Sequence, residues 1–119
     1  MAKSQLDSGQ VDLTRTINTV SGTTYTFALS DSVSSGGNPI VLFSNSGAIT
    51  ATISSATGFP IGAQIELIQM GTGTVQLSAS GVNLLRLNNT SPLNTGGQYV
   101  GLTAIQTSAN NWVVMGYIT

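Results

Sequence analysis

Few residues in this 119-residue sequence could do chemistry. The chain has no histidine and no cysteine, so the commonest general base, the usual metal ligands and every thiol nucleophile are missing. A carboxylate pair of the kind that cleaves glycosidic bonds would have to come from Asp7, Asp12, Asp31 and Glu66, and all but Glu66 lie near the N-terminus. The sequence therefore predicts a protein that is not an enzyme and that needs no metal or other cofactor.

The glycines of the stretch IELIQMGTGTVQL, Gly71 and Gly73, are a candidate phosphate-binding loop because they follow an apolar, strand-like run. Such a loop needs a helix after it to receive the negative charge, and usually a lysine or a third glycine in register. The residues that follow, VQLSAS, alternate as a strand, and no lysine occurs after Lys3. We therefore expect a β-hairpin over residues 65–77, with Gly71 or Gly73 supplying the positive φ of its turn.

Glu66 is the only acidic residue after Asp31. It could accept hydrogen bonds from a sugar or bind calcium, but a buried calcium site draws on several oxygen ligands with carboxylates among them. Arg86 is the basic residue nearest to Glu66 in the sequence. The sequence therefore favours an ion pair between Glu66 and Arg86.

Aromatic side chains near the C-terminus allow two interpretations. Tyr99, Trp112 and Tyr117 could stack against a sugar, or they could be anchors in the core or in a subunit interface, and the second interpretation is favoured. The candidate residues for contacts with a partner are Leu6, Val11, Leu13, Tyr99, Trp112 and Tyr117.

The scarcity of charge is the strongest compositional signal. Only 6% of the residues are charged, against about 25% in an ordinary soluble protein. A surface of Ser, Thr, Asn, Gln and Gly gives up the repulsion that keeps monomers apart, which suits a protein built into an assembly. With a net charge of −1 and three basic residues, the chain has no electrostatic footprint for nucleic acid or for an anionic membrane. No apolar run is long enough to span a bilayer, and the first ten residues do not form a secretory signal.

The elements that must position these residues are strands. TYTFALS, AITATIS and TVQLSAS alternate apolar and polar residues, which is typical of half-buried antiparallel strands. NPIVLFSN and WVVM are continuous apolar runs, as expected of strands covered on both sides or with one face in a subunit interface. About eight to ten short strands between turn clusters predict a single antiparallel β-sandwich or jelly-roll-like domain over residues 11–119, with few or no helices. Residues 1–10 are predicted to be a flexible arm.

Pairs of the form Thr-x-Thr begin at Thr14, Thr24, Thr50 and Thr72, and the interval differs from each pair to the next. These pairs could suggest an ice-binding face, but the flat repeated array of such a face needs one constant spacing, so the sequence argues against it. Separately, no repeat of fixed period is seen along the chain, which argues against a solenoid.

The stretches ATGFPIGAQIELIQMGTGTVQLSASGVNLL and GGQYVGLTAIQTSANNWVVMGYIT resemble a small all-β module of tailed-bacteriophage structural proteins. The shared pattern is a GFPIG-type turn into an apolar strand, a glycine turn, an alternating strand, a GGQY entry and a closing hairpin that ends NNWVVMG. The similarity covers roughly residues 48–119. It implies a structural role in a virion, with trimeric assembly.

The chain has no coiled coil, collagen-like repeat or long stalk, which departs from fibre proteins. We therefore expect a homotrimeric decoration or cement protein on the surface of a phage capsid, whose partners are copies of itself and the major capsid protein or another virion protein. The alternative is a fibre-tip or host-attachment module that binds surface polysaccharide through Tyr99, Trp112 and residues 88–97.

Overall fold

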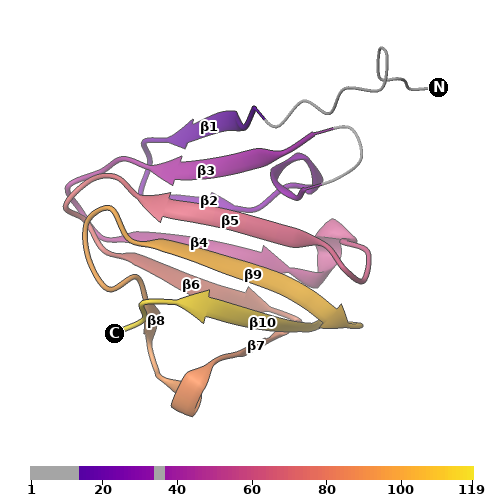
Figure 1. Ribbon diagram of the computed structural model, residues 1–119. Coiled ribbons are helices and arrows are strands. Elements are labelled where there is room, and N and C mark those ends of the chain that lie inside the picture. Colours follow the sequence, from indigo (N-terminus) through magenta and orange to yellow (C-terminus); the bar gives the residue numbers. More distant parts are fainter. Residues whose placement is uncertain (1–13, 34–36) are drawn as a thin grey trace.

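The computed structural model describes residues 14–33 and 37–119, which form strands joined by turns and short 3-10 helices (Figure 1). The prediction of an all-β chain with few or no helices is confirmed for these residues. The strands are β1 (Thr16–Val20), β2 (Thr24–Thr26), β3 (Pro39–Phe43), β4 (Ile49–Ser54), β5 (Gln64–Gln69), β6 (Val75–Ser80), β7 (Asn83–Leu85), β8 (Leu93–Asn94), β9 (Gly101–Ser108) and β10 (Asn111–Gly116). The 3-10 helices are η1 (Leu29–Asp31), η2 (Ser55–Thr57) and η3 (Leu87–Asn89).

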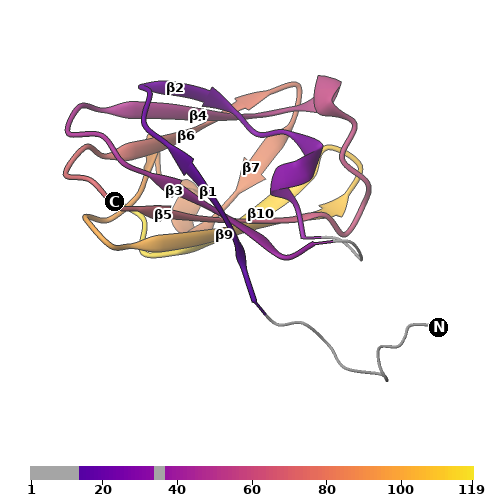
Figure 2. The same cartoon turned by 90° about the horizontal axis from the view of Figure 1, so that it is seen from above.

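The strands form two sheets that face each other as two layers (Figure 2). One sheet has six strands in the order β1-β3-β5-β9-β10-β7, and the other has four in the order β2-β4-β6-β8. Each strand alternates, and its inward side chains fill the space between the layers. The core therefore draws on both sheets, and its largest fully buried side chains are Trp112, Phe27, Phe43, Ile49, Ile53, Ile65, Leu67 and Leu102.

The first six strands wind as the three coils of a β-solenoid. Each coil contributes one strand to each sheet: β1 and β2, then β3 and β4, then β5 and β6. Every strand lies parallel to its counterpart in the next coil, which gives four parallel pairings. The pairing of β7 with β10 is also parallel, so five of the eight strand pairings are parallel. The prediction of an antiparallel, jelly-roll-like fold is therefore wrong. Alternation shows that one face of a strand is buried, and it carries no information about the direction of the neighbouring strand.

The coils repeat with a regular period in the four-stranded sheet, where Thr24 pairs with Thr50 and Thr50 pairs with Gln76 at the same interval. In the six-stranded sheet Val41 pairs with Leu67, again at that interval. The expectation that argued against a solenoid is therefore wrong. The Thr-x-Thr pairs that begin at Thr24 and Thr50 stack in adjacent coils, whereas those that begin at residues 14 and 72 lie outside the paired positions of β2, β4 and β6.

The C-terminal part closes the solenoid with antiparallel strands. β9 pairs with β5 in the six-stranded sheet, and β8 pairs with β6 in the four-stranded sheet. β10 turns back along β9, so the expected closing hairpin at NNWVVMG is present. Its Trp112 is fully buried and meets Phe59 edge to face at 5.2 Å between ring centroids.

The stretch IELIQMGTGTVQL is a corner between the two sheets, not a β-hairpin, because β5 and β6 belong to different sheets. Gly71 and Gly73 have no positive φ, so both parts of that prediction are wrong. The corner instead stacks on the corner of the preceding coil. A Cβ atom on Gly71 would lie 2.7 Å from the backbone nitrogen of Asn45, and one on Gly73 would lie 2.6 Å from the carbonyl carbon of Gly47. The two glycines allow the coils to approach each other closely.

Candidate functional site

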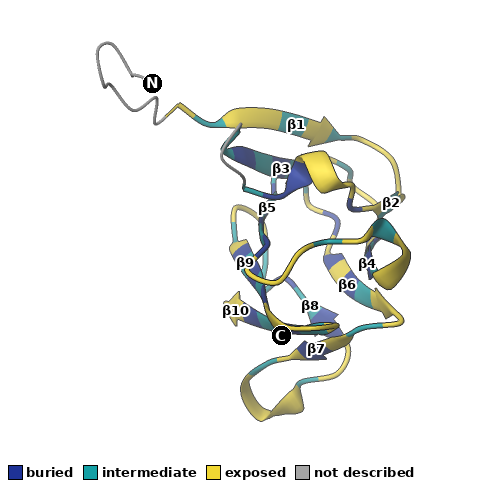
Figure 3. Ribbon diagram, turned by 90° about the vertical axis from the view of Figure 1, so that its right-hand side faces the viewer, coloured by how far each residue is buried: buried dark blue, intermediate teal, exposed yellow. Residues whose placement is uncertain are grey.

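The outer face of the six-stranded sheet is the strongest candidate for an interaction surface. Alternation sends one set of side chains into the core and the other set outward, where apolar and polar residues are mixed. Figure 3 shows how far each residue of the sheet is exposed. Ile17 is 55% exposed and Met115 is 45% exposed. We call this surface the apolar face, and it consists of Ile17, Ile40, Leu42, Ile68, Leu85, Ile105, Val113 and Met115.

The strand register places these outward side chains in adjoining rows. Ile17 pairs with Ile40, and Leu42 pairs with Ile68. Towards the other edge of the sheet Val113 stands between Ile105 and Leu85. Side chains paired in this way contact each other across the sheet. The eight side chains form two apolar groups, one on β1, β3 and β5 and one on β9, β10 and β7, because Glu66 pairs with Thr103 between them. Exposed apolar groups on a small chain are candidate places for another molecule to bind.

The outer face of the four-stranded sheet is polar and carries no charge on its strands. Thr24, Thr50 and Gln76 form one row across β2, β4 and β6. The next outward row along the same strands holds Thr26, Thr52 and Ser78. We call this surface the hydroxyl face. The two outer faces therefore differ in chemistry, and the polar hydroxyl face is the better solvated of the two.

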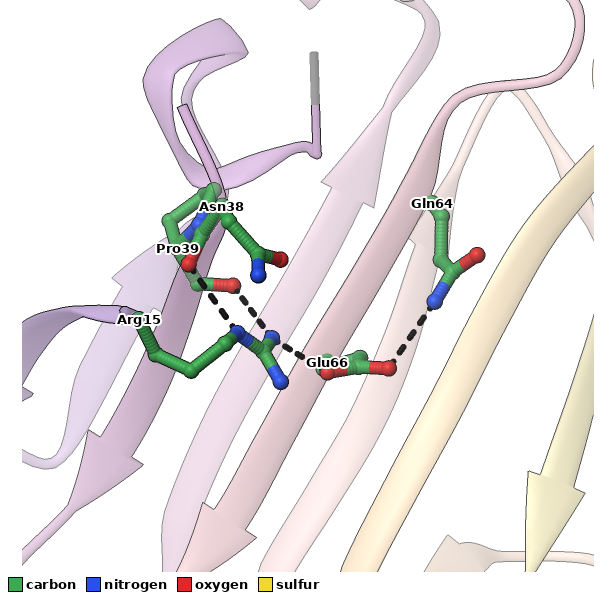
Figure 4. Close-up of polar contacts among 5 residues, drawn as sticks. All are labelled: Arg15, Asn38, Pro39, Gln64 and Glu66. Carbon is green, nitrogen blue, oxygen red and sulfur yellow. Dashed lines mark hydrogen bonds and ion pairs between the residues drawn. The ribbon is translucent and has the colours of Figure 1, made fainter. Parts of the chain in front are cut away.

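Glu66 is neutralised on the apolar face by Arg15, so the predicted pair of Glu66 with Arg86 is wrong (Figure 4). Arg15 Nη2 donates to Glu66 Oε1, and Gln64 Nε2 donates to Glu66 Oε2 at 2.9 Å. Arg15 also donates to the backbone carbonyls of Asn38, at 3.0 Å, and Pro39, at 2.9 Å. Coil stacking brings the residue before β1 across β3 to β5, and a contact over such a long stretch of chain has no signal in the sequence.

Arg86 has a different role, in the segment that follows β7. Its Nε donates to the carbonyl of Thr90 at 2.6 Å, and its Nη1 donates to the carbonyl of Leu84 at 2.5 Å. No carboxylate of residues 14–33 or 37–119 forms an ion pair with it. Arg86 therefore holds its own loop in place while its charge stays uncompensated within this part of the chain.

The aromatic candidates separate into one core residue and two surface residues. Trp112 is fully buried, so the favoured interpretation of this residue as a core anchor is confirmed, and its candidacy for contact with a partner or a sugar is wrong. Tyr99 is 69% exposed and Tyr117 is 64% exposed, so both can reach a partner. Tyr99 adopts a left-handed backbone with φ of 68°, and its N–H donates to the carbonyl of Gln69 at 2.6 Å.

A buried polar cluster lies at the first coil. The carboxylate of Asp31 accepts hydrogen bonds from Asn18 Nδ2 at 2.9 Å, from the hydroxyl of Tyr25 at 2.5 Å and from the N–H of Ala28 at 2.8 Å. Burial, together with the hydrogen bond to Asp31 and its charge, raises the pKa of Tyr25 to about 12. Because each oxygen of this carboxylate has a donor, the cluster is best explained as a support for the turn that contains η1.

The candidate contact residues Leu6, Val11 and Leu13, like the predicted arm, lie outside the residues that the structure describes. Within the described chain, no group of three or more His, Asp or Glu side chains could hold a metal ion. None of the helices found there is long and apolar enough to cross a membrane.

Sequence reasoning missed most of the apolar face, including Ile17, Leu85 and Met115. The continuous apolar runs IVLF and WVVM did indicate strands with a second apolar side. Only the register shows which of those sides share one outer face and how they are grouped on it. Comparison of the chain with protein-family models, with curated proteins and with solved structures finds no match.

Proposed function

We propose that this chain is a non-enzymatic structural protein of a virion, a homotrimeric capsid decoration or cement protein whose copies meet through the apolar face. The observation that carries the proposal is the apolar face itself. Eight apolar side chains, in two groups, lie on one outer face of a 119-residue chain that has only seven charged residues to keep it apart from its copies. Burial of such a surface between copies removes apolar area from water and stabilises the assembly.

The resemblance of residues 48–119 to modules of phage structural proteins supports the threefold arrangement and the placement on a virion. The work of such a protein is mechanical, because each trimer bridges neighbouring capsid subunits and adds contact area across their joints. Contacts made by apolar burial and neutral hydrogen bonds are little screened by salt. A shell held by this protein would therefore keep its decoration over a wide range of ionic strength.

The alternative function, a fibre-tip module that binds surface polysaccharide, is favoured by one observation. Tyr99 and Tyr117 are exposed aromatic rings, and both come near Gly96: Tyr99 follows it closely in the chain, and the carbonyl of Tyr117 accepts from its N–H at 2.8 Å. Exposed aromatic rings can stack on sugars. The number of copies in each purified virus particle, counted by quantitative mass spectrometry, separates the two functions. Hundreds of copies support decoration of the head, and a few to a few dozen support a tail or fibre.

Self-association can be tested by substitutions that introduce positive charge on the apolar face and, as a control, on the hydroxyl face. The double variant Ile17→Lys/Met115→Lys puts two positive charges on the apolar face, whereas the control Thr24→Lys/Thr50→Lys puts the same two charges on the hydroxyl face. All four positions are exposed, so both variants should keep the strand content measured by circular dichroism. We expect sedimentation to show monomers for the first variant and unchanged association for the control. Equal behaviour of the two variants would show that the apolar face is not the interface.

A further inference from the structure

A groove of about 490 Å³ lies between β6 and the segment that runs from β7 through η3 to β8. In Figure 1 this segment extends away from the body of the solenoid below β10. The volume falls within the range of about 300–1,000 Å³ that is usual for small-molecule sites. Leu85 lines the groove and also belongs to the apolar face, so the groove borders that face.

The charges of the described chain single out this groove. Glu66 pairs with Arg15, and the buried carboxylate of Asp31 accepts three hydrogen bonds. Arg86, which lines the groove, has no carboxylate partner among the described residues. It is therefore a localised positive charge in a nearly uncharged surface, and it attracts an anion most strongly where water is partly excluded.

The guanidinium of Arg86 is fixed but not saturated. Its bonds to the carbonyls of Leu84 and Thr90 use two of the five N–H donors of a guanidinium group. Trp112 Nε1 is the only fully buried side-chain nitrogen or oxygen of the described residues that lacks a partner, so Arg86 Nη2, for which these residues supply no acceptor, is not sealed from solvent. Because two carbonyls of its own loop hold the guanidinium in place, the N–H donors that do not bond to the loop have a fixed orientation in which they can bind a carboxylate.

The loop around Arg86 keeps this arrangement by local bonds. The N–H of Asn89 donates to the carbonyl of Arg86 at 3.2 Å, and the N–H of Thr90 donates to that of Leu87 at 3.4 Å. Asn88 and Asn89 both adopt left-handed backbone, with φ of 57° and 50°. Asparagine adopts left-handed backbone more readily than most residues other than glycine, so the pair suits a tight turn of the loop. This turn brings Asn89 to the wall of the groove.

The rest of the lining is amphipathic and neutral. Gln76, Ser78, Asn83, Asn89 and Ser91 offer amide and hydroxyl groups, and Leu77, Leu84 and Leu93 are among the apolar residues that line the same space. A sugar ring has hydroxyl groups at its edge and C–H groups on its faces, so it matches a lining of both kinds. A phosphate group carries up to two negative charges and would meet a single cation here, whereas the one charge of a carboxylate is matched by one guanidinium. We propose that the groove binds an acidic saccharide, with its carboxylate on Arg86 and its hydroxyl groups on the neutral polar lining.

Isothermal titration of the full chain with a homogeneous oligogalacturonate tests the proposal, with a neutral malto-oligosaccharide of equal length and inorganic sulfate as the other probes. We expect the oligogalacturonate to bind at least about 10-fold more tightly than either, since hydrogen bonds to a charged group are the strong ones. Equal binding of inorganic sulfate would show that the groove holds simple anions only. Equal binding of the neutral sugar would show that Arg86 does not select for charge, and absence of binding by all three would overturn the site.

Variants locate the binding on the groove. Arg86→Gln should abolish the preference for the acidic sugar, but it also removes two bonds that hold the loop. Gln76→Glu avoids this problem, because it adds a negative charge at the groove without a change to Arg86. The matched control is Thr24→Glu, which adds the same charge to the same row of the hydroxyl face two coils away. We expect about 10-fold weaker binding for Gln76→Glu and unchanged binding for Thr24→Glu. If both variants bind like the wild type, the saccharide does not bind in the groove.

Discussion

At the scale of single residues, the buried carboxylate of Asp31 shows how a nearly uncharged protein keeps a charge inside. Its donors come from Asn18 in β1, from Tyr25 in β2 and from the backbone before η1. An isolated buried carboxylate is costly, and three donors offset that cost. Asp31 therefore has a structural role, which leaves one carboxylate fewer among the few candidates for catalysis.

Tyr25 gives the cluster a measurable pH dependence. The folded protein raises the pKa of Tyr25 from its ordinary 10.0 to about 12, so the folded state holds this proton more tightly than the unfolded state. The resulting stabilisation is complete below pH 10 and is lost as the pH rises from 10 to about 12. We predict that the free energy of unfolding of the wild type, measured with urea, falls across this interval. It should fall less steeply for Tyr25→Phe.

The control for that prediction is Tyr117→Phe, because the ring of Tyr117 is exposed. Its free energy of unfolding should follow the same pH curve as the wild type. If Tyr25→Phe also follows the wild-type curve between pH 10 and 12, the proton on Tyr25 does not contribute to stability.

Single residues were also where the sequence was least informative about the site. Because the chain has few charged residues, Glu66 has few possible partners, and Arg86 was predicted because it is the basic residue nearest in the sequence. The actual partner, Arg15, is brought to Glu66 by coils that stack side by side, so the choice depends on strand register. Trp112 likewise could be assigned to the core or to the surface only after the pairing of β10 was known.

At the scale of elements, the corners between sheets decide how the coils stack. The corner SNSG of the second coil and the corner MGTG of the third stand one coil period apart in the sequence and are in contact. Asn45 connects the corners of all three coils: its side chain donates to the carbonyl of Ser21, in the corner of the first coil, at 2.7 Å and accepts from the N–H of Gly47, in its own corner, at 2.7 Å. Its own carbonyl accepts from the N–H of Gly73 at 2.9 Å.

We predict that Gly73→Ala destabilises the protein by about 1–3 kcal/mol, because the added methyl group would meet the backbone of Gly47. Gly97→Ala is the matched control, since a Cβ atom there meets nothing within 4 Å and its φ is not positive. The control should stay within about 0.5 kcal/mol of the wild type. Urea unfolding measures both. Similar free energies of unfolding for the two variants would contradict the close stacking of the corners.

The strands themselves were predictable from the sequence, but the solenoid was not. The burial of Ile49, Ala51 and Ile53 on one face of β4 follows directly from alternation, and it is confirmed. The period of the coils could not be found as a repeat of identical residues, because equivalent positions in successive coils share apolar or polar character and not the same amino acid. Ile49 of the second coil pairs with Val75 of the third, and Thr50 pairs with Gln76. In addition, the corner between β1 and β2 is shorter than the corners of the later coils, so the interval between β1 and β3 is shorter than the interval between β2 and β4. Identical residues therefore do not recur at a constant spacing.

At the scale of the whole molecule, the solenoid has two unlike outer faces. The hydroxyl face can stay in water at no cost, whereas the apolar face gains free energy when another surface covers it. Composition alone predicted that the chain is built for association, but it could not place the interface, because that depends on which strands are neighbours. The apolar face supplies the missing location, and the Arg86 groove lies at its border.

The molar mass of the wild-type protein in solution tests the central claim, that the chain associates with itself through an apolar surface. Light scattering at micromolar concentration, in low and in high salt, should give three times the 12.2 kDa of one chain under both conditions. Salt should have little effect because apolar contacts are not screened. A mass of one chain at micromolar concentration, or a trimer that dissociates as salt is added, would contradict the account.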